Sequence, residues 1–308
     1  MSVGLDDVLQ AREVLAGRVH RTPVLPCEGL DGVRLKAELF QRTGSFKARG
    51  ALNRVTALSP EERARGVVTW SAGNHARAVA WACAESGVDC LVAMWETASA
   101  FKIAATRAYG ATVDTSSPDA SAAYEVARQA VERDGRVFVH PHNDPEVLAG
   151  HGTLALEILE DVPELETVVV GVGGGGLVSG VLVALDGRAR VVAVEPERSP
   201  ALSAALAAGR SVPVETATIA DGLAAPFAGD LAVELCSGRV ESVLVSEDEI
   251  RAGMRFLYAK AKLACEPAGA AAVGALLAGK VEAGPGVVAV VSGGNVVAEE
   301  AAAILASR

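Results

Sequence analysis

The segment from which the fold can be inferred is Gln41-Arg42-Thr43-Gly44-Ser45-Phe46-Lys47-Ala48-Arg49-Gly50. The run before it, residues 33–40, alternates apolar with charged side chains, which predicts a half-buried strand. Thr43-Gly44 predicts a turn, and the apolar spacing after it predicts a helix with Lys47 near its N-terminus. The positive end of a helix dipole favours a neutral lysine amine. We therefore expect Lys47 to be the catalytic centre.

On both sides of this segment, the sequence predicts helices and strands in alternation. Residues 5–16 carry apolar side chains at helical spacing. Strands are expected at 67–70, 90–94, 111–114 and 137–140, with helices at 76–83, 99–109 and 121–133. We expect residues 66–143 to form a small domain that is inserted into a large domain made of residues 1–65 and 144–308.

The second half of the chain continues this pattern. Residues 167–172 and 286–291 are apolar, β-branched runs typical of buried parallel strands, and 191–194 is a shorter run of the same kind. Helices are expected at 152–159, at 177–185, and from the capping box of Ser246 and Glu249 to about residue 263. The sequence thus predicts the α/β class, with two open, mostly parallel sheets covered by helices.

Composition restricts the classes of partner. The 308 residues carry a formal net charge of −10, which argues against nucleic acid and anionic membrane surfaces as partners. No apolar stretch reaches the roughly 18 residues of a membrane-spanning helix, and we recognise no signal peptide. The 5 cysteines are scattered without a C-x-x-C pair, so we expect a cytoplasmic protein without structural zinc.

Four glycines, Gly173, Gly174, Gly175 and Gly176, separate a predicted buried strand from a predicted helix. Amides without side chains at a helix N-terminus form a cradle for phosphate, although a tight turn alone would also use glycine. Gly171, Gly173 and Gly176 also match a dinucleotide fingerprint, with Glu195 at the end of the next strand. An NAD-dependent oxidoreductase therefore stays open as an alternative.

Lys47 has neighbours that an ordinary surface lysine lacks. Phe46 can cover a planar ring, and Gly44 and Ser45 supply close polar backbone. A lysine amine forms a Schiff base with a carbonyl compound and, once displaced from it, can act as a base. Such a lysine together with a phosphate cradle points to a cofactor that carries both an aldehyde and a phosphate, which is pyridoxal 5'-phosphate.

Several ordered motifs give the chain a resemblance to a known family. They are His20-Arg21-Thr22-Pro23, Lys36-x-Glu38-x-x-Gln41, Gly44-Ser45-Phe46-Lys47-x-Arg49-Gly50-Ala51, Ser71-Ala72-Gly73-Asn74-His75-Ala76, Ala149-Gly150-x-Gly152-Thr153, the four glycines, Ile219-Ala220-Asp221-Gly222, Glu266-Pro267-x-Gly269-Ala270 and Ser292-Gly293-Gly294-Asn295. With them the sequence resembles the fold-type-II pyridoxal-phosphate enzymes, whose fold is similar to the tryptophan synthase β subunit. The resemblance is to the branch of threonine/serine dehydratases and serine racemase.

The resemblance implies a role for each motif. Lys47 would hold the cofactor covalently, Phe46 would pack on its ring, and Gly173, Gly174, Gly175 and Gly176 would bind its phosphate. The remaining positions are Asn74 at the ring hydroxyl, Ser292 at the pyridine nitrogen with Gly222 and Glu266 nearby, and Ser71, Ala72, Gly73, Asn74 and His75 at the substrate carboxylate. It also implies a small amino-acid substrate and a homodimer.

The implied reaction is β-elimination from a hydroxy amino acid. A neutral Ser292 should leave the pyridine nitrogen unprotonated, which disfavours a long-lived carbanion and suits prompt elimination. We expect an ammonia-lyase that converts L-threonine and/or L-serine to 2-oxobutyrate or pyruvate plus ammonia. Serine racemase and a dehydratase of another β-hydroxy amino acid, such as 3-hydroxyaspartate, stay open as alternatives. The intact Lys47, Asn74 and Ser292 argue against a nucleotide- or amino-acid-sensing protein that has lost the chemistry.

Three positions depart from parts of the family. Ala72 stands where serine racemases of animal type place a second serine, which makes efficient racemisation less expected. Glu195 lies where some relatives bind a divalent ion, but Ala201 replaces their second carboxylate, so we expect no metal. His142 stands where a relative has an asparagine near the cofactor. His140, His142 and Asp144 resemble a metal cluster, although a proline-containing crossing between domains explains them better.

Overall fold

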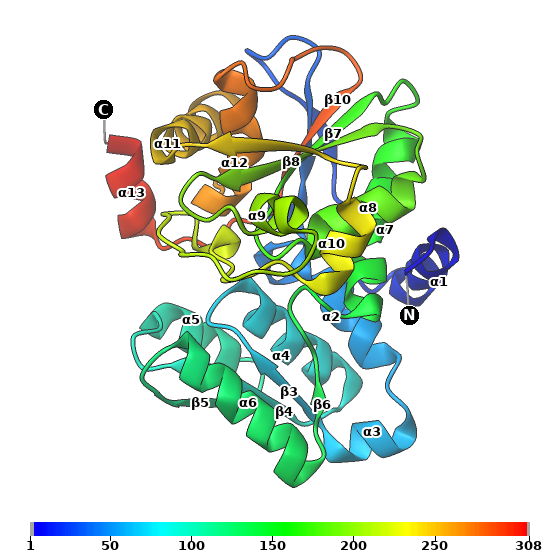
Figure 1. Ribbon diagram of the computed structural model, residues 1–308, viewed down its shortest axis with the longest axis vertical. Coiled ribbons are helices and arrows are strands. Elements are labelled where there is room, and N and C mark those ends of the chain that lie inside the picture. Colours follow the sequence, from blue (N-terminus) through cyan, green and yellow to red (C-terminus); the bar gives the residue numbers. More distant parts are fainter. Residues whose placement is uncertain (1–2, 307–308) are drawn as a thin grey trace.

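The computed structural model describes residues 3–306, and in it the chain forms two sheets, one above the other (Figure 1). The 6-stranded sheet has the order β1-β2-β10-β7-β8-β9, and the 4-stranded sheet has the order β5-β4-β3-β6. The larger sheet comprises β1 (Val24–Pro26), β2 (Arg34–Ala37), β7 (Thr167–Gly171), β8 (Arg190–Pro196), β9 (Glu241–Val245) and β10 (Val287–Val291). The smaller sheet comprises β3 (Val67–Trp70), β4 (Cys90–Trp95), β5 (Thr112–Ser117) and β6 (Val137–Phe138).

All strand pairs are parallel except β1 with β2, which confirms the predicted fold class. The α-helices are α1 (Leu5–Leu15), α2 (Lys47–Thr56), α3 (Pro60–Arg65), α4 (Asn74–Ser86), α5 (Ala100–Arg107), α6 (Ala120–Asp134), α7 (Pro145–Asp161), α8 (Gly176–Leu185), α9 (Ala201–Ala208), α10 (Asp230–Cys236), α11 (Glu247–Phe256), α12 (Pro267–Leu277) and α13 (Ala298–Ala306). Short 3-10 turns occupy Glu38–Phe40, Arg42–Gly44 and Asp221–Leu223, and a π-helical turn occupies Leu257–Ala261.

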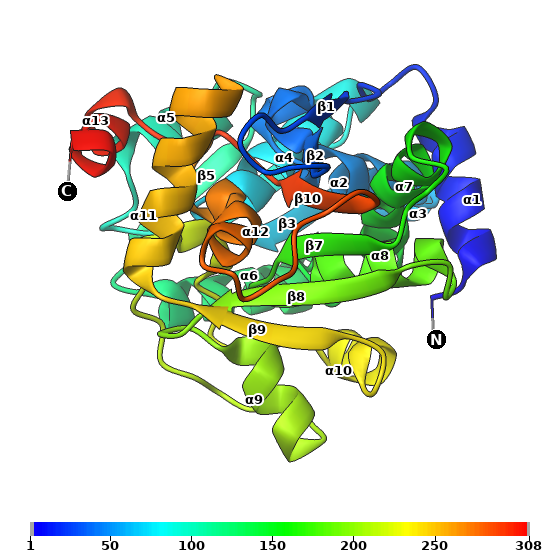
Figure 2. The ribbon, with the colours of Figure 1, turned by 90° about the horizontal axis from the view of Figure 1, so that it is seen from above.

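The larger sheet is buried on both faces. Successive side chains of a strand point to opposite faces, so Val168 and Val170 of β7 pack with α7 and α8, whereas Val169 packs with α12. Figure 2 shows α11 and α12 toward one side of this sheet and α1, α7 and α8 toward the other. This two-sided burial explains why β7 and β10 are apolar at nearly every position.

The smaller sheet has its own pair of cores. Trp70 and Ala93 pack with α6 on one face, and Val67 packs with α4 on the other. Helix α2 belongs to this second core through Leu52, although it precedes the sheet in sequence. The strands of this sheet all lie between residues 67 and 138, while the division of the chain at 66 and 143 remains a prediction.

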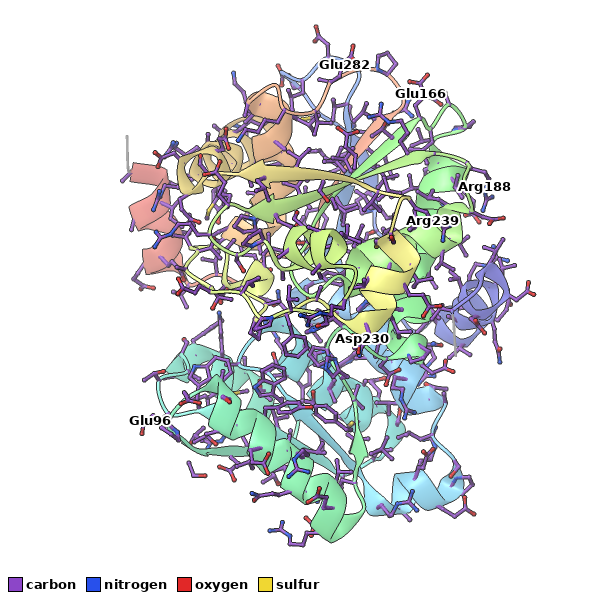
Figure 3. The ribbon with its side chains drawn as sticks, in the orientation of Figure 1. Glu96, Glu166, Arg188, Asp230, Arg239 and Glu282 are labelled. Carbon is purple, nitrogen blue, oxygen red and sulfur yellow. The ribbon has the colours of Figure 1, made fainter. Side chains whose placement is uncertain are left out.

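The surface carries most of the charge. Glu96, Glu166, Arg188 and Glu282 are exposed and lie at the outer edge of the molecule (Figure 3). Within the described residues, no helix is long and apolar enough to cross a membrane.

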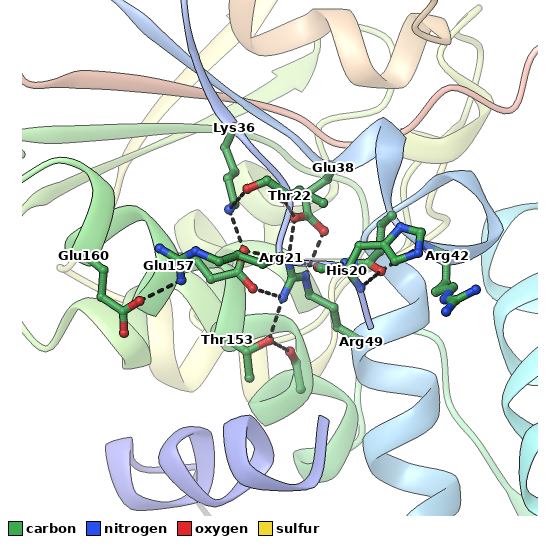
Figure 4. Close-up of polar contacts among 12 residues, drawn as sticks. His20, Arg21, Thr22, Lys36, Glu38, Arg42, Arg49, Thr153, Glu157 and Glu160 are labelled. Atoms are coloured by element: carbon green, nitrogen blue, oxygen red, sulfur yellow. Dashed lines mark hydrogen bonds and ion pairs between the residues drawn. The ribbon is translucent and has the colours of Figure 1, made fainter. Parts of the chain in front are cut away.

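The predicted strand at 33–40 differs most from the structure. It ends at Ala37, and its charged residues Lys36 and Glu38 are fully buried, with no exposed side chain at either position. They pair there with Glu157 and Arg49 in a buried charge cluster (Figure 4). Alternation of charged and apolar residues therefore indicated a half-exposed strand wrongly, because buried partners from distant segments neutralise the charges.

Other boundaries also moved. The strand expected at 137–140 ends at residue 138, and the helix expected from 152 begins at Pro145. The capping box of Ser246 and Glu249 is present, but its α-helix ends at Phe256 before the π-helical turn. Helix α7 begins earlier because the side chain of Asp144 accepts hydrogen bonds from the first-turn amides of Glu146 and Val147.

Candidate active site

A cavity of about 510 Å³ is lined by segments of both sheets, and every site residue that the sequence nominated lines it. Contributing segments are the start of α2, the β3–α4 turn, the β7–α8 turn, the 3-10 turn at residues 221–223, the start of α12 and the end of β10. Carboxyl ends of parallel strands meet at one edge of a sheet, which is where open α/β folds bind ligands. The positions are thus brought together; their roles stay predictions.

Lys47 is the first residue of α2, and the surface that it exposes faces this cavity. Its Nζ donates a hydrogen bond to the carbonyl oxygen of Pro141 at 2.6 Å and lies 5.1 Å from the centre of the Phe46 ring. Burial lowers the pKa of Lys47 to about 7. A large share of the amine is therefore neutral near neutral pH, and burial is the cause.

The glycine turn joins β7 to α8 on the wall of the cavity. Gly175 has a φ of +90°, and a Cβ placed on it would lie 2.4 Å from Cβ of Ala232. A Cβ on Gly174 would lie 2.3 Å from the ring of His142. Close packing therefore requires glycine at these two positions whether or not a ligand binds.

The same turn also fits a phosphate group. No side chain caps the start of α8, so its first amides are left for a ligand in the cavity. The helix dipole favours an anion at this position, and no side chain of the glycines obstructs it. These features and the neutral amine of Lys47 are what a cofactor with an aldehyde and a phosphate requires.

Ser292, Asn74 and Glu266 also line the cavity. The carbonyl oxygen of Ser292, just after β10, accepts a hydrogen bond from the amide of Phe46 at 3.1 Å. The Asn74 amide donates from Nδ2 to Oε1 of Glu266 at 2.6 Å. Burial, and then the charge of Asp221, raise the pKa of Glu266 to about 7, although the Asn74 donor opposes the shift. Gly222 also lines the cavity here.

The β3–α4 turn carries the residues that are predicted to bind the substrate carboxylate. The amide of Gly73 donates to Oγ of Ser71 at 3.1 Å, and Ala72 also lines the cavity. His75 has its Nε2 3.1 Å from the carbonyl oxygen of Val139, and burial holds its pKa well below the usual value. The imidazole is thus tied to backbone, so the predicted contacts to a carboxylate rest on Oγ of Ser71 and on amides of the turn other than those of Ser71 and Gly73.

One feature of the site was missed by the sequence reasoning. Lys102 of α5 forms an ion pair with Asp221, and both residues line the cavity. Asp221 belongs to a quoted motif, but nothing about a single lysine at position 102 indicates its partner. His142, which the sequence placed near the cofactor by resemblance, also lines the cavity, and its Nε2 is buried without a hydrogen-bond partner.

The carboxylates that suggested other ligands have partners within the protein. Glu195 accepts hydrogen bonds from the amides of Leu202 and Ser203 at 2.6 and 2.8 Å, so it caps α9. Asp144 caps α7 and pairs with Arg54 at 2.9 Å. Across residues 3–306, no group of three or more histidine, cysteine or acidic side chains is arranged to hold a metal ion.

Comparison with known proteins gives concordant matches. A family model described as pyridoxal-phosphate dependent enzyme matches residues 15–293. The chain is 45% identical to an L-threonine ammonia-lyase of Thermotoga maritima, over 96% of this chain and 76% of that protein. It is 39% identical to the catabolic L-threonine dehydratase of Escherichia coli K12, over 96% of this chain and 94% of that protein.

Solved structures agree with these matches. Maize serine racemase superimposes with a TM-score of 0.91 at 34% identity, covering 97% of this chain and 95% of that one. The processed form of threonine deaminase isoform 2 from Solanum lycopersicum superimposes with a TM-score of 0.91 at 30% identity, covering 99% of this chain and 90% of that one.

Proposed function

This chain belongs to the family of pyridoxal-phosphate-dependent enzymes, and we propose that it is an ammonia-lyase acting on L-threonine and/or L-serine. The products would be 2-oxobutyrate or pyruvate plus ammonia. The observation that carries the proposal is the placement of Lys47: its buried amine faces the same cavity as the uncapped, glycine-rich start of α8. The names of the relatives at 45% and 39% identity support the choice of substrates.

The residues divide the work as follows. The first amides of α8 would hold the phosphate of pyridoxal phosphate, and Lys47 would bind its aldehyde carbon. When bound, this cofactor withdraws electrons from the substrate Cα and so acidifies the proton there. The backbone amides after Ser71 would hold the substrate carboxylate, and Asn74 would meet the cofactor's ring oxygen.

Lys47 also moves the proton. With the substrate in place, the neutral Nζ of Lys47 would take the proton from Cα, because burial lowers the pKa of this amine. The C–O bond at Cβ would then break, and the hydroxyl would leave as water with the proton that Lys47 had taken from Cα. The released enamine tautomerises to an imine, and addition of water to the imine gives the 2-oxo acid and ammonia.

Elimination is favoured over racemisation by Ala72. A racemase needs a second proton-transferring group on the face of Cα opposite the lysine, and a methyl group cannot supply one. Ala72 lines the cavity, as expected for a residue that could meet that face. L-serine converted to D-serine faster than to pyruvate would contradict this part of the proposal.

The visible spectrum of the purified protein tests the proposal first. We expect a yellow protein that borohydride bleaches irreversibly, with the label on Lys47, and that forms 2-oxobutyrate from L-threonine or pyruvate from L-serine. Lys47→Ala should abolish both properties. Lys280→Ala, which removes a lysine on the surface that pairs with Glu249, is the matched control and should retain both. Turnover by Lys47→Ala close to that of the unaltered chain would refute the assignment.

A cytoplasmic homodimer completes the proposal. All 5 cysteines are free and buried, which suits a reducing compartment. The resemblance to dehydratases and racemases is what supports the homodimer. Light scattering of the eluted protein should give about twice the 31.4 kDa of one chain, and a value near 31.4 kDa would refute it.

A further inference from the structure

Asn74 is one link in a chain of side-chain hydrogen bonds that begins outside the cavity. Nη1 of Arg77 donates to Oδ1 of Asn295 at 2.7 Å. Nδ2 of Asn295 donates to Oδ1 of Asn74 at 2.7 Å, and Nδ2 of Asn74 donates to Oε1 of Glu266 at 2.6 Å. Residues from α4, from the segment after β10 and from the start of α12 thus converge on one amide.

The chemistry of the partners gives this chain a single direction. A guanidinium group can only donate, so Asn295 must turn its oxygen toward Arg77. Nδ2 of Asn295 also donates to the carbonyl oxygen of Thr43 at 2.8 Å, and a carbonyl oxygen can only accept. The orientation of the Asn295 amide is therefore determined at both of its ends, and it offers Asn74 a donor.

Asn74 inherits that orientation. Its oxygen accepts from Asn295, so its nitrogen faces Glu266 and carries a second hydrogen beside the cavity that Asn74 lines. A reversed amide would oppose donor to donor at Asn295 and, while Glu266 is ionised, oxygen to oxygen at Glu266. Two hydrogen bonds would be lost together.

We propose that Arg77 and Asn295 are positioning residues that hold the Asn74 amide with its nitrogen toward the ligand oxygen in the cavity. The inference rests on the proposed function, since it takes that ligand oxygen to be the ring oxygen of pyridoxal phosphate. An oxygen that carries negative charge is bound by an N–H group and repelled by a carbonyl oxygen. Arg77 would thus act on the cofactor only through Asn295 and Asn74.

The backbone around Asn295 supports a positioning role. Gly44 has a φ of +79°, and a Cβ placed on it would lie 2.5 Å from Oδ1 of Asn295. The amide of Gly294 donates to the carbonyl oxygen of Gly44 at 3.0 Å, and Ser45 forms an isolated bridge with Gly293. The segment that holds Asn295 is therefore packed on the segment that leads to Lys47.

The test is a titration of cofactor-free protein with pyridoxal phosphate. Asn295→Asp keeps an acceptor for Arg77 but has no N–H for Asn74, so the dissociation constant should rise roughly tenfold or more. Arg77→Leu should raise it by a smaller factor, and Arg77→Lys should restore part of the loss because it keeps a donor. Asn53→Asp is the matched control. Nδ2 of Asn53 donates to the carbonyl oxygen of Glu146 at 2.8 Å, and Asn53 does not line the cavity.

A double-mutant cycle separates positioning from a general loss of stability. If Arg77 acts through Asn74, Arg77→Leu should not raise the dissociation constant further in protein that already carries Asn74→Ala. The thermal unfolding temperature of Asn53→Asp should fall without a change in cofactor affinity. Additive effects of Arg77→Leu and Asn74→Ala on the dissociation constant, or an unaltered affinity of Asn295→Asp for pyridoxal phosphate, would overturn this inference but not the proposed function. An unaltered chain that binds no pyridoxal phosphate would overturn the proposed function as well.

Discussion

Replacement of Arg49 by methionine should destabilise the fold by the cost of leaving a buried carboxylate without its partner. Arg49 is 1% exposed and donates to both oxygens of Glu38 at 2.7 and 2.9 Å, while Glu38 itself is fully buried. Arg49 also forms an ion pair with Glu157, and Glu157 forms a second ion pair with Lys36 (Figure 4). Two cations and two carboxylates thus balance in the protein interior.

The expected magnitude follows from this balance. Arg49→Met leaves one ammonium for two carboxylates, and removal of one partner from a buried ion pair costs about 3–5 kcal/mol. Most of the cost falls on Glu38, because Glu157 is 14% exposed and keeps Lys36 at 2.5 Å. The double variant Arg49→Met/Glu38→Gln restores neutrality, so it should be more stable than Arg49→Met by about 1–2 kcal/mol.

Urea unfolding of cofactor-free protein measures these differences, followed by both circular dichroism and fluorescence. The decisive result is whether the addition of Glu38→Gln to Arg49→Met raises or lowers the free energy of unfolding. If Glu38→Gln destabilises the Arg49→Met background as much as it destabilises the unaltered chain, the two charges are not coupled and the reasoning fails.

The difference in the free energy of unfolding between the unaltered chain and Arg49→Met should also depend on pH. Burial opposes ionisation of Glu38, but the charges and hydrogen bonds of Arg49 outweigh it and hold the pKa below its usual value. In the unaltered chain, the stability that ionised Glu38 contributes is fully present above its pKa in the unfolded state. It is lost as pH falls through its pKa in the folded state. Without Arg49 the pKa of Glu38 should rise, and protonation then removes the unpaired charge. The stability gap between the two proteins should therefore narrow as pH falls, and a gap that widens would contradict the assignment.

Three further predictions concern single positions. Burial lowers the pKa of Lys47 to about 7. The rate at which pyridoxal phosphate and borohydride label Lys47 in cofactor-free protein should therefore level off above about pH 8. A rate that continues to rise to about pH 10 would indicate an ordinary lysine. Gly175→Ala should abolish tight cofactor binding because its φ is +90° and its Cβ would lie 2.4 Å from that of Ala232, while Gly187→Ala, with a φ of +77° and open space around it, should bind normally in the same titration. Glu195→Ala removes the side-chain acceptor at the start of α9 and should cost about 1 kcal/mol in urea unfolding, with no change in the KM for L-threonine.

The local structure of this protein was predictable from neighbouring residues. The apolar run of β7, the glycine turn after it and the helix that begins with Lys47 each depend on short-range chemistry, namely burial on both faces, backbone freedom and apolar spacing. The order of several such motifs also indicated the cofactor family, which the match over residues 15–293 confirms. Distant contacts were not needed for these conclusions.

The tertiary structure alone decided which side chains from distant parts of the sequence contact one another. Asn295 and Asn74 are 221 residues apart, and Lys36 and Glu157 are 121 apart. A charged residue in a short strand has the same sequence pattern whether water or a buried carboxylate neutralises it, so the burial of Lys36 could not be foreseen. The same holds for Lys102 beside Asp221 and for Arg77 behind Asn74. Folding brings such pairs together because the two sheets bury their faces against shared helices, and the position of each side chain then depends on packing across the whole molecule.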